Sequence, residues 1–436
     1  MAYPSIRLKR LVALFASLAL PSVAPPAMHR RTDLPFILNE SLSTVSDPIV
    51  IVSAVRTPMG GMLGSLSAVP AAELGAVAIQ AAVERAGLSK DAVDEVLMGN
   101  VLGAGQGQAP ARQAARGAGL DDATSCTTLN KMCGSGMKTV MLAHDLLKAG
   151  TVNVMVAGGM ESMSNAPYLL PKARNGYRFG HGELLDHMAL DGLEDAYETR
   201  TPMGEFAERT AEAYGFSREA QDAFAIESLK RAGAAVENAF ADEIAPVTIK
   251  SRRGDTVIET DEQPAKARPD KIPGLRPAFR KDGTITAANA SSISDGAAAL
   301  VLMRESEAEQ RGLKPVARIL GHASHSRLPA EFTVAPGHAI KALLDKLEMT
   351  ANDIDLWEIN EAFAVVAMAA MQDVGIPHEN MNVNGGACAL GHPIGASGAR
   401  ILVTLLGAMA GREARVGVAS LCIGGGEAVA MAVERL

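Results

Sequence analysis

The segment LSKDAVD at residues 88–94 returns later in the chain as MTANDID at residues 349–355. Each copy follows an apolar stretch with the spacing of a helix and precedes an apolar stretch typical of a strand. The two segments therefore indicate the same succession of helix, turn and strand at two places far apart in the sequence.

Two further features follow each copy in the same order. A turn of small residues opens a predicted helix, GSG at 134–136 in the first half and ASG at 396–398 in the second. A predicted strand then ends in glycines, at 158–159 in the first half and at 424–426 in the second. Because these features keep their order at nearly constant offset, chance similarity in a chain rich in Ala and Gly is the weaker explanation. The chain is expected to contain two related halves.

The elements of the first half alternate between strand and helix. Ile49–Val52 is a continuous apolar run, as expected for a strand in a sheet that is covered on both faces. A helix is predicted over Ala71–Ala86, with Gly87 at the position of a C-terminal cap, and another strand over Glu95–Met98. This alternation predicts an α/β fold.

The composition changes between the two halves. Residues 47–165 together with 286–314 are expected to form the N-terminal half, and residues 315–436 the C-terminal half. Residues 166–285 hold four of the five Tyr and six of the ten Phe, with clustered charges and prolines. A long segment placed between related halves is expected to be an inserted loop domain that takes part in substrate recognition.

Charge and cysteine content exclude several functional classes. The chain has 436 residues, a net charge of −8 and one Trp. Nucleic acid is not expected as its main partner, because such binding depends on Lys and Arg that neutralise phosphates. The four cysteines, Cys126, Cys133, Cys388 and Cys422, contain no C-x-x-C pair. Neither a zinc site of the usual spacing nor a secreted disulfide framework is therefore expected.

The first 46 residues, 1–46, are expected to lie outside the fold. Three basic residues precede the apolar run Leu11–Leu20, which resembles the start of a signal peptide. That run is too short to cross a bilayer. A transit peptide, or a true start at Met28, fits this stretch as well. We expect a cytoplasmic protein with no membrane partner.

Cys133 lies in the segment NKMCGSGMK, residues 130–138, where a strand-to-helix turn is predicted. A thiol at a helix N-terminus is close to unpaired N–H groups and the positive end of the helix dipole, so its thiolate is expected to be favoured. The alternative is a small buried Cys before a helix, and this segment alone does not decide between them. For Cys126 and Cys388 we expect buried, inert thiols.

The second half supplies the chemical partners of Cys133. His392 lies in a glycine-rich turn before a predicted helix, Cys422 lies at a predicted strand end, and the polar pair Asn360–Glu361 follows another strand. In α/β sheets, binding sites form outside the carboxyl ends of strands. If the two halves pack face to face, these loops should meet at Cys133.

These segments together resemble the thiolase family, specifically its acetyl-CoA acetyltransferase (acetoacetyl-CoA thiolase) type, over residues 48–436. The matching segments are NKMCGSGMK, GGMESMS, NASSISDGAAA, NEAFA, GGACALGHPIGASG and CIGGG. The resemblance implies a five-layered fold of two similar α/β halves, with the inserted loop domain holding coenzyme A. It also implies a homodimer or homotetramer.

The resemblance implies the catalytic roles. Cys133 would attack an acyl-CoA thioester and carry the acyl group, with His392 as the base that activates it. Cys422 would remove a proton from the α-carbon of acetyl-CoA. His392 and a water held by Asn360 are implied as donors to the enolate oxygen. The backbone N–H groups of Cys133 and Gly424 are implied for the oxyanion on the acyl-cysteine.

The resemblance also implies the substrate contacts. Ser291 should lie against the pantetheine arm, and Met203 and Phe363 should line the acyl pocket. Lys266 and Arg268 are placed near the nucleotide. Acetyl-CoA and acetoacetyl-CoA would be the substrates, and no metal or redox cofactor is implied, because both reaction partners are thioesters.

One departure from the family pattern concerns acyl specificity. Pro202-Met203-Gly204 stands where acetyl-specific members usually have His-Met-Gly, and the segment Glu198–Thr201 is one residue longer. A degradative thiolase for longer 3-ketoacyl-CoAs therefore stays open, as does the direction of flux in fatty acid metabolism. A ketoacyl synthase would pair its cysteine with two histidines, whereas this chain has Asn360 and Cys422. A non-catalytic acyl-CoA-binding relative would lack one of the three reactive side chains.

Overall fold

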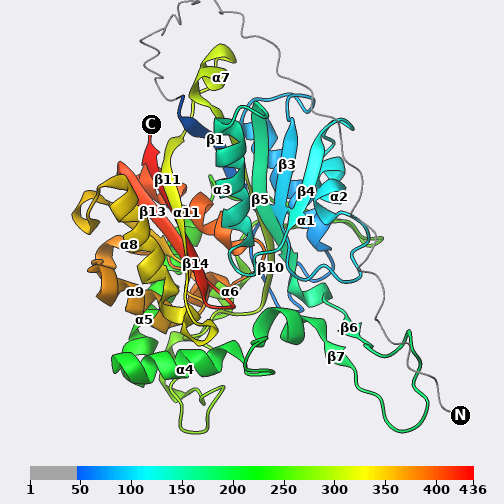
Figure 1. Cartoon of the computed structure of the whole chain (residues 1–436), viewed down its shortest axis with the longest axis vertical. Coiled ribbons are helices and arrows are strands. Elements are labelled where there is room, and N and C mark those ends of the chain that lie inside the picture. The colour runs from blue at the N-terminus through cyan, green and yellow to red at the C-terminus, as the bar shows by residue number, and fades with distance from the viewer. Residues whose placement is uncertain (1–46) are drawn as a thin grey trace, which may run out of the picture. The chain divides into compact units, whose positions relative to one another are not determined.

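The computed structural model describes residues 47–436, and all structural statements refer to this range. The expectation for residues 1–46 lies outside it. Figure 1 shows the chain from its first strand in blue to its last strand in red.

The fold is organised by one ten-stranded sheet. Its strands follow the order β12-β13-β14-β11-β1-β10-β5-β3-β4, and β2 pairs with β10. Their bounds are β1 (Ile49–Arg56), β2 (Gly60–Gly61), β3 (Glu95–Gly99), β4 (Ser125–Leu129), β5 (Val154–Ser162), β10 (Ser294–Arg304), β11 (Ala317–Ser326), β12 (Leu356–Ile359), β13 (Val416–Ile423) and β14 (Glu427–Arg435).

The sheet consists of two similar parts joined at one seam. In the first part β3 is parallel to β5, and β5 is antiparallel to β10. In the second part β12 is parallel to β13, and β13 is antiparallel to β14. At the seam β1 pairs with β11 through only two residue pairs, Val50 with Arg318 and Ile51 with Ala317. The prediction of two related halves is confirmed.

The repeated segment has the same role in both halves. The carboxylate of Asp94, the last residue of the first copy, accepts hydrogen bonds from the N–H groups of Asn153 and Val154 at 2.7 and 2.9 Å. Asp355 ends the second copy and binds the two N–H groups of residues 415–416 at 2.8 and 2.9 Å. Each aspartate thus satisfies the otherwise unpaired backbone donors where the neighbouring strand begins.

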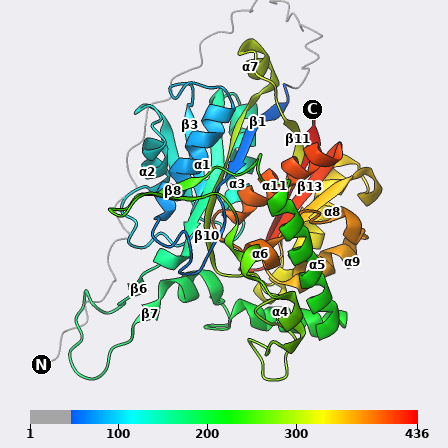
Figure 2. The same ribbon diagram turned by 180° about the vertical axis from the view of Figure 1, so that it is seen from behind.

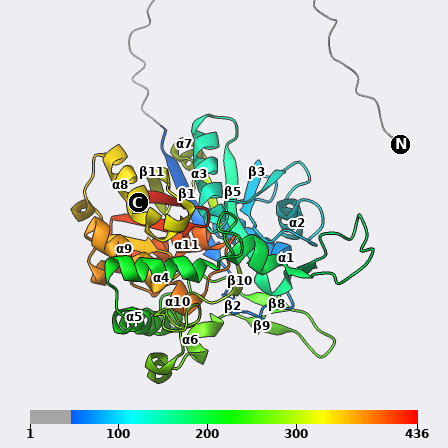
Figure 3. The same cartoon turned by 60° about the horizontal axis from the view of Figure 1, so that its bottom comes forward.

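Helices cover both faces of each half. Helices α1 and α2 pack on the outer face of the first half, and α8 and α9 on the outer face of the second. Helices α3 and α11 lie between the halves and share one core with both (Figures 1 and 3). The helix bounds are α1 (Ala71–Arg85), α2 (Pro110–Gly117), α3 (Ser135–Lys148), α7 (Glu305–Gln310), α8 (Ala335–Leu347), α9 (Ala364–Val374), α10 (Ala387–Leu390) and α11 (Ser397–Arg412). This arrangement gives the five layers that the family resemblance implies.

The strands are apolar on both faces for this reason. Along β10, Leu300 and Leu302 face the central core, whereas Val301 and Met303 face α1 and α2. Burial on both faces removes the apolar–polar alternation of a half-exposed strand. The prediction from the apolar run at Ile49–Val52 is confirmed in the same way by β1.

One predicted boundary is wrong. Strand β5 was expected to end at Gly158 and Gly159, but it continues to Ser162. A Cβ atom at Gly158 would lie 2.1 Å from the carbonyl oxygen of Ala298, and one at Gly159 would lie 2.1 Å from that of Gly395. These glycines permit close backbone contact inside the strand and do not mark its end.

Residues 166–285 contribute shorter elements that lie over both halves (Figure 2). Helices α4 and α5 pack against α9 and α10 of the second half. The elements are β6 (Tyr168–Leu169), β7 (Leu185–Asp186), the π-helix η2 (Ala189–Leu193), α4 (Met203–Tyr214), α5 (Arg218–Glu237), β8 (Val247–Ile249), β9 (Thr256–Ile258), α6 (Glu262–Lys266) and the 3₁₀ helix η3 (Pro269–Gly274). Short 3₁₀ helices elsewhere are η1 (Met163–Asn165), η4 (Pro329–Val334), η5 (Ala351–Asp353) and η6 (His378–Asn380). Among the helices of residues 47–436, none combines the length and the apolar character that crossing a membrane requires.

Arg56 fixes this segment to the first half. Its fully buried guanidinium donates to Glu243 and, through two parallel bonds of 2.7 and 2.8 Å, to Asp261. It also stacks over the ring of Phe240 at 4.6 Å. Burial opposes the charge, but the two carboxylates together raise the pKa of Arg56 above its usual value. The guanidinium therefore stays charged and holds three parts of the chain together.

Arg56→Met should lower the free energy of unfolding by about 3–5 kcal/mol, because it leaves two carboxylates buried without their cation. The control is Arg311→Met, which breaks a partly exposed pair with Glu307 and should change stability by less than about 1 kcal/mol. Guanidinium denaturation of both variants measures the difference. Equal effects would show that the buried network does not carry this stability.

Candidate active site

Cys133 lies in the tight turn between β4 and α3. The Ser135 hydroxyl donates to the carbonyl of Met132 at 2.6 Å and accepts the N–H of Lys131 at 2.8 Å. Met132 itself has a φ of +46°, a left-handed conformation that is unfavourable for a side chain of this size. The turn thus holds strained backbone immediately before the cysteine, as is common where a reactive side chain is positioned.

The second half places two groups on this sulfur. Strand β13 ends at Ile423, so Cys422 is its penultimate residue and Gly424 follows the strand. The backbone N–H groups of Gly424 and of Cys133 itself lie near the Cys133 sulfur and lower the pKa of its thiol, against the effect of burial. Two N–H groups converging on one atom can stabilise negative charge there or on an oxygen attached nearby.

His392 lies in the loop between α10 and α11, and Ser397 fixes its orientation. The Ser397 hydroxyl lies 2.5 Å from Nδ1 of His392 and donates its own proton to the carbonyl of Pro393 at 2.9 Å. Because that proton is used, Ser397 must accept a proton from Nδ1. The tautomer that results leaves Nε2 free to accept a proton.

Asn360 connects His392 to a buried ion pair. Its amide nitrogen lies 3.5 Å from both ring nitrogens of His392, and its oxygen accepts from Arg400 at 3.4 Å. Arg400 also donates to Glu358 at 2.9 Å, and both charged groups are buried. Burial raises the pKa of Glu358, whereas the charge and the hydrogen bond of Arg400 oppose this shift and favour the carboxylate. Asn360 therefore directs its N–H₂ group at the histidine.

A cavity of about 530 Å³ opens onto these groups. It is lined by Cys133, His392 and Gly424, together with three residues predicted from the family resemblance to contact substrate, Met203, Phe363 and Ser291. Phe363 meets Phe279 edge to face, with ring centroids 6.1 Å apart. Cys422 is fully buried and lies in the core cluster directly behind this wall, beside Phe363.

Lys266 and Arg268 lie at a second, smaller cavity of about 320 Å³. Lys271, which the sequence reasoning did not single out, is a third basic residue on its wall. The two cavities share Ala287 and Ser292 in their linings, so they adjoin. The structure thus separates the ten predicted site residues into a reactive group and a basic group at adjoining cavities.

The protonation state of Cys133 differs from the expectation, and that of His392 is set by burial as well. Burial raises the pKa of Cys133 to about 11, although the N–H groups of Gly424 and Cys133 oppose this shift. The prediction that the helix N-terminus favours the free thiolate is therefore wrong, because desolvation outweighs the backbone donors. Burial, with a smaller effect of Arg400, lowers the pKa of His392 to about 3. At neutral pH both the thiol and the imidazole are uncharged.

Glu161 is a buried residue of the site region that was not identified from the sequence. It accepts the N–H groups of Val101, Leu102 and Gly395 at 2.9–3.2 Å. Burial raises its pKa to about 7. Glu161 thereby fixes the loop that carries His392 to the end of β3. The polar residue in the otherwise apolar GGMES segment was the available signal.

The expectation of buried, inert thiols at Cys126 and Cys388 is met only in part, because both are half-buried and Cys388 lines the basic cavity. All four are free thiols. Burial raises the pKa of Cys126 and, more strongly, that of Cys388, so both stay protonated. Cys388 donates its backbone N–H to Glu361 at 3.0 Å, which gives this glycine-rich segment a structural contact.

The sequence and structure are similar to those of known proteins. The thiolase N-terminal domain matches residues 49–306, and the thiolase C-terminal domain matches residues 313–435. Acetyl-CoA acetyltransferase of Cupriavidus necator is 52% identical over 390 residues, covering 89% of this chain and 99% of the relative. That of Schizosaccharomyces pombe is 47% identical over 395 residues, covering 90% and 100%. The crystal structure of a thiolase from Ascaris suum in complex with coenzyme A covers 89% of this chain and all of its own, with a TM-score of 0.84 and 43% identity.

The two domain matches leave only a short link unmatched between residues 306 and 313. They meet in the middle of the sheet, and the loops of both surround the cavity that holds Cys133 and His392. Sequence, fold and site agree that this chain belongs to the thiolase family.

Proposed function

We propose that this protein is an acetyl-CoA C-acetyltransferase. It condenses two molecules of acetyl-CoA to acetoacetyl-CoA and coenzyme A, reversibly, through an acyl group on Cys133. The observation that carries the proposal is that Cys133, His392 and Gly424 line one cavity, with the backbone N–H groups of Cys133 and Gly424 near the Cys133 sulfur. Relatives at 52% and 47% identity that are named acetyl-CoA acetyltransferases support it.

The first step follows from the neutral state of both groups. A thiol with a pKa of about 11 is a poor nucleophile at pH 7, and His392 with a pKa of about 3 is an uncharged acceptor. Nε2 of His392 takes the proton as the sulfur attacks the thioester carbonyl. The N–H groups of Cys133 and Gly424 stabilise the oxyanion. Coenzyme A then leaves as its thiol with the proton from His392.

The second step needs a strong base, because the α-carbon of a thioester is a weak acid. Burial, followed by the neighbouring Cys133, raises the pKa of Cys422 well above its usual value. Its thiol passes its proton to His392, which is neutral again after the first step, and the thiolate so formed is basic enough to take a proton from the methyl group of the second acetyl-CoA. The protonated His392 and a water held by Asn360 are proposed as the donors to the enolate oxygen that develops. The carbanion attacks the acyl-Cys133 carbonyl, and the sulfur of Cys133 leaves and takes its proton from His392.

The adjoining cavities suit the long shape of coenzyme A. We assign its anionic nucleotide end to the basic cavity with Lys266, Arg268 and Lys271, and its pantetheine arm to the passage beside Ser291. The reaction proposed here uses thioesters and side chains alone and requires no metal or redox cofactor. Nucleic acid and membranes have no part in it.

We further propose a cytoplasmic homodimer or homotetramer. Strand β4 lies at the end of the sheet order and leaves one edge unpaired within residues 47–436. Free backbone donors and acceptors of this kind favour pairing with a second copy. Four free cysteines, one of them the proposed nucleophile, suit a reducing compartment.

Alkylation of Cys133 by iodoacetamide should accelerate about tenfold per pH unit between pH 7 and 9, without a plateau, because only the thiolate reacts and the pKa is about 11. Peptide mass spectrometry that follows the residue itself gives the rate. A plateau near neutral pH would indicate a preformed thiolate–imidazolium pair and contradict the proposed proton transfer.

Cys133→Ala should abolish thiolysis of acetoacetyl-CoA and leave no acetylated protein in intact-mass spectrometry, because the acyl carrier is lost. Cys422→Ser should still accept an acetyl group on Cys133 but should condense poorly. A serine hydroxyl loses its proton far less readily than a thiol, so the base that takes the α-proton is not formed. Cys126→Ser is the control, since Cys126 lies on β4 away from the cavity, and it should keep activity. Turnover by Cys133→Ala would refute the mechanism.

Acyl specificity should be set near Pro202, which precedes α4 and lines the cavity. In the segment before it, Arg200 has a left-handed backbone, with a φ of +65°. We expect kcat/KM to fall for 3-ketoacyl-CoAs longer than four carbons, and Pro202→His to steepen that fall. A flat or rising profile in the unmodified enzyme would favour the degradative, broad-chain alternative.

A further inference from the structure

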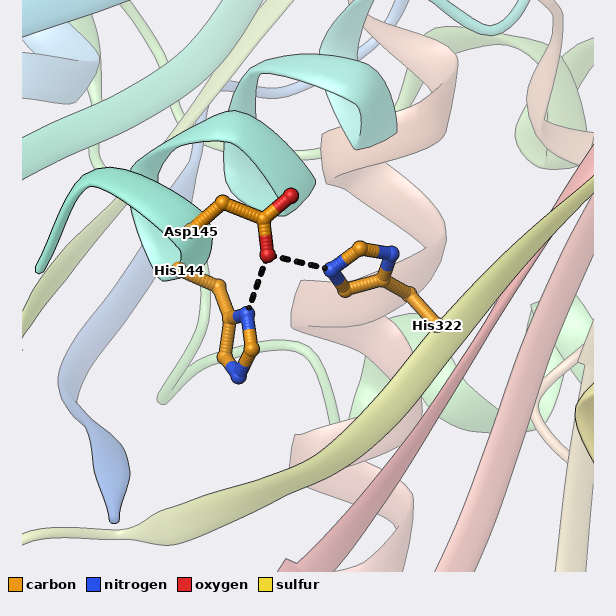
Figure 4. A group of neighbouring side chains, drawn as sticks. All are labelled: His144, Asp145 and His322. Carbon is orange, nitrogen blue, oxygen red and sulfur yellow. Dashed lines mark hydrogen bonds and ion pairs between the residues drawn. The ribbon is translucent and has the colours of Figure 1, made fainter. Parts of the chain in front are cut away.

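A cluster of three side chains lies outside the catalytic cavity, where the two halves meet. His144 and Asp145 are consecutive residues of α3, and His322 lies on β11 of the second half. Figure 4 shows both imidazole rings directed at the same carboxylate oxygen. Asp145 Oδ1 is 2.9 Å from His144 Nδ1 and 3.0 Å from His322 Nε2.

We propose that His144, Asp145 and His322 form a binding site for a divalent transition metal ion of the Zn²⁺ or Ni²⁺ class. Two imidazole nitrogens and one carboxylate oxygen form a ligand set that suits these ions. It does not suit Mg²⁺ or Ca²⁺, which prefer oxygen ligands alone. The three donor atoms lie within 4.8 Å of one another, so they can reach one ion after small side-chain rotations.

The separations favour a particular geometry. Donors about 2.1 Å from a metal and about 3 Å apart subtend roughly 90° at the ion, the angle between neighbouring ligands in tetragonal or octahedral coordination. The side chains of His144 and His322 are each only 12% exposed, whereas that of Asp145 is 54% exposed. The protein therefore supplies one side of the coordination sphere, and the solvent side is open to water.

The protonation of the cluster is compatible with a metal. Burial lowers the pKa of His322, although Asp145 opposes this, so the ring is neutral at pH 7. Hydrogen bonds from the two histidines outweigh burial and lower the pKa of Asp145, which stays ionised. On binding, the imidazole nitrogen that faced Asp145 takes the metal, and the proton on that nitrogen moves to the other nitrogen or to solvent.

The surroundings define how selective the site can be. Lys346 of α8 donates to the backbone carbonyl of His322 at 3.2 Å, which places one positive charge near the ion. That positive charge repels cations. Only ions that form strong bonds to imidazole are therefore expected to bind. The two rings already meet edge to face at 5.1 Å, so little reorganisation is needed.

A bound ion would connect α3 to β11, two elements of different halves. Helix α3 is also the helix that begins beside Cys133. Because the metal binds the folded arrangement and not the unfolded chain, it should raise the stability of the protein. This inference does not depend on the proposed acetyltransferase reaction.

The test is a calorimetric titration of the full chain with ZnCl₂ and with NiCl₂. It is done in a Cys133→Ala/Cys422→Ala background, because the catalytic thiols and His392 could also bind these metals. We expect one ion per chain, no binding of MgCl₂, and an affinity at least about tenfold lower in His322→Ala, because loss of a direct ligand exceeds the 10–100-fold effect of outer partners. Asp145→Asn should also weaken binding. Because Asp145 is exposed and Asn has nearly the same shape, this variant tests the site even if His322→Ala fails to fold.

His325→Ala is the matched control, since it removes a histidine from the same strand without touching the cluster. Thermal unfolding gives a second measurement, and Zn²⁺ should raise the midpoint in the background protein and in His325→Ala but not in His322→Ala. Three results would overturn the site. The first is that the background protein binds no ion, and the second is that His322→Ala and Asp145→Asn both bind as tightly as the background protein. The third is that His325→Ala loses binding to the same extent as His322→Ala. Failure here leaves acetyl transfer by the unmodified enzyme intact.

Discussion

The structure depends on the close approach of two helix N-termini. A Cβ atom on Gly136 of α3 would lie 2.7 Å from the backbone nitrogen of Ala399, and one on Gly398 of α11 would lie 2.3 Å from that of Met137. The two central helices therefore touch backbone to backbone, through one glycine from each half. Because Cys133 precedes α3 and His392 precedes α11, this contact brings the proposed nucleophile and base to one cavity.

Burial at that contact sets the chemistry. In water a cysteine and a histidine would titrate within a few units of each other, whereas here their pKa values move apart to about 11 and about 3. The proton therefore stays on sulfur until a substrate arrives, and no ion pair has to be broken when an acyl group binds. Ser397 accepts the proton of Nδ1, so Nε2 of the neutral His392 is the nitrogen that can accept a proton. The fold thus supplies orientation and donors, and the reaction itself creates the charge.

The sequence predicts the parts of this arrangement that come from local pattern. The repeat at Asp94 and Asp355 indicates two related halves, and Cys133 and His392 each precede a helix as expected. What fails are properties that depend on a partner distant in the chain. Gly158 and Gly159 read as a strand end because nothing local shows the carbonyls of Ala298 and Gly395 that press on them. The direction of the Cys133 pKa shift was mispredicted for a related reason, since burial raises this pKa and the local sequence does not show that burial.

The two halves have the same arrangement of strands, but equivalent positions carry residues with different roles. In the second half, Cys422 is the penultimate residue of strand β13, and Gly424 follows the strand at the cavity. In the first half, the corresponding strand β5 carries Glu161, whose carboxylate instead holds the backbone of the His392 loop through Gly395. A second reactive group at that position would compete for the same proton. With Glu161 bound to three backbone N–H groups, the first half contributes the proposed nucleophile, Cys133, and a rigid support for the His392 loop. The asymmetry of a reaction between two different thioesters is thus built on a symmetric sheet.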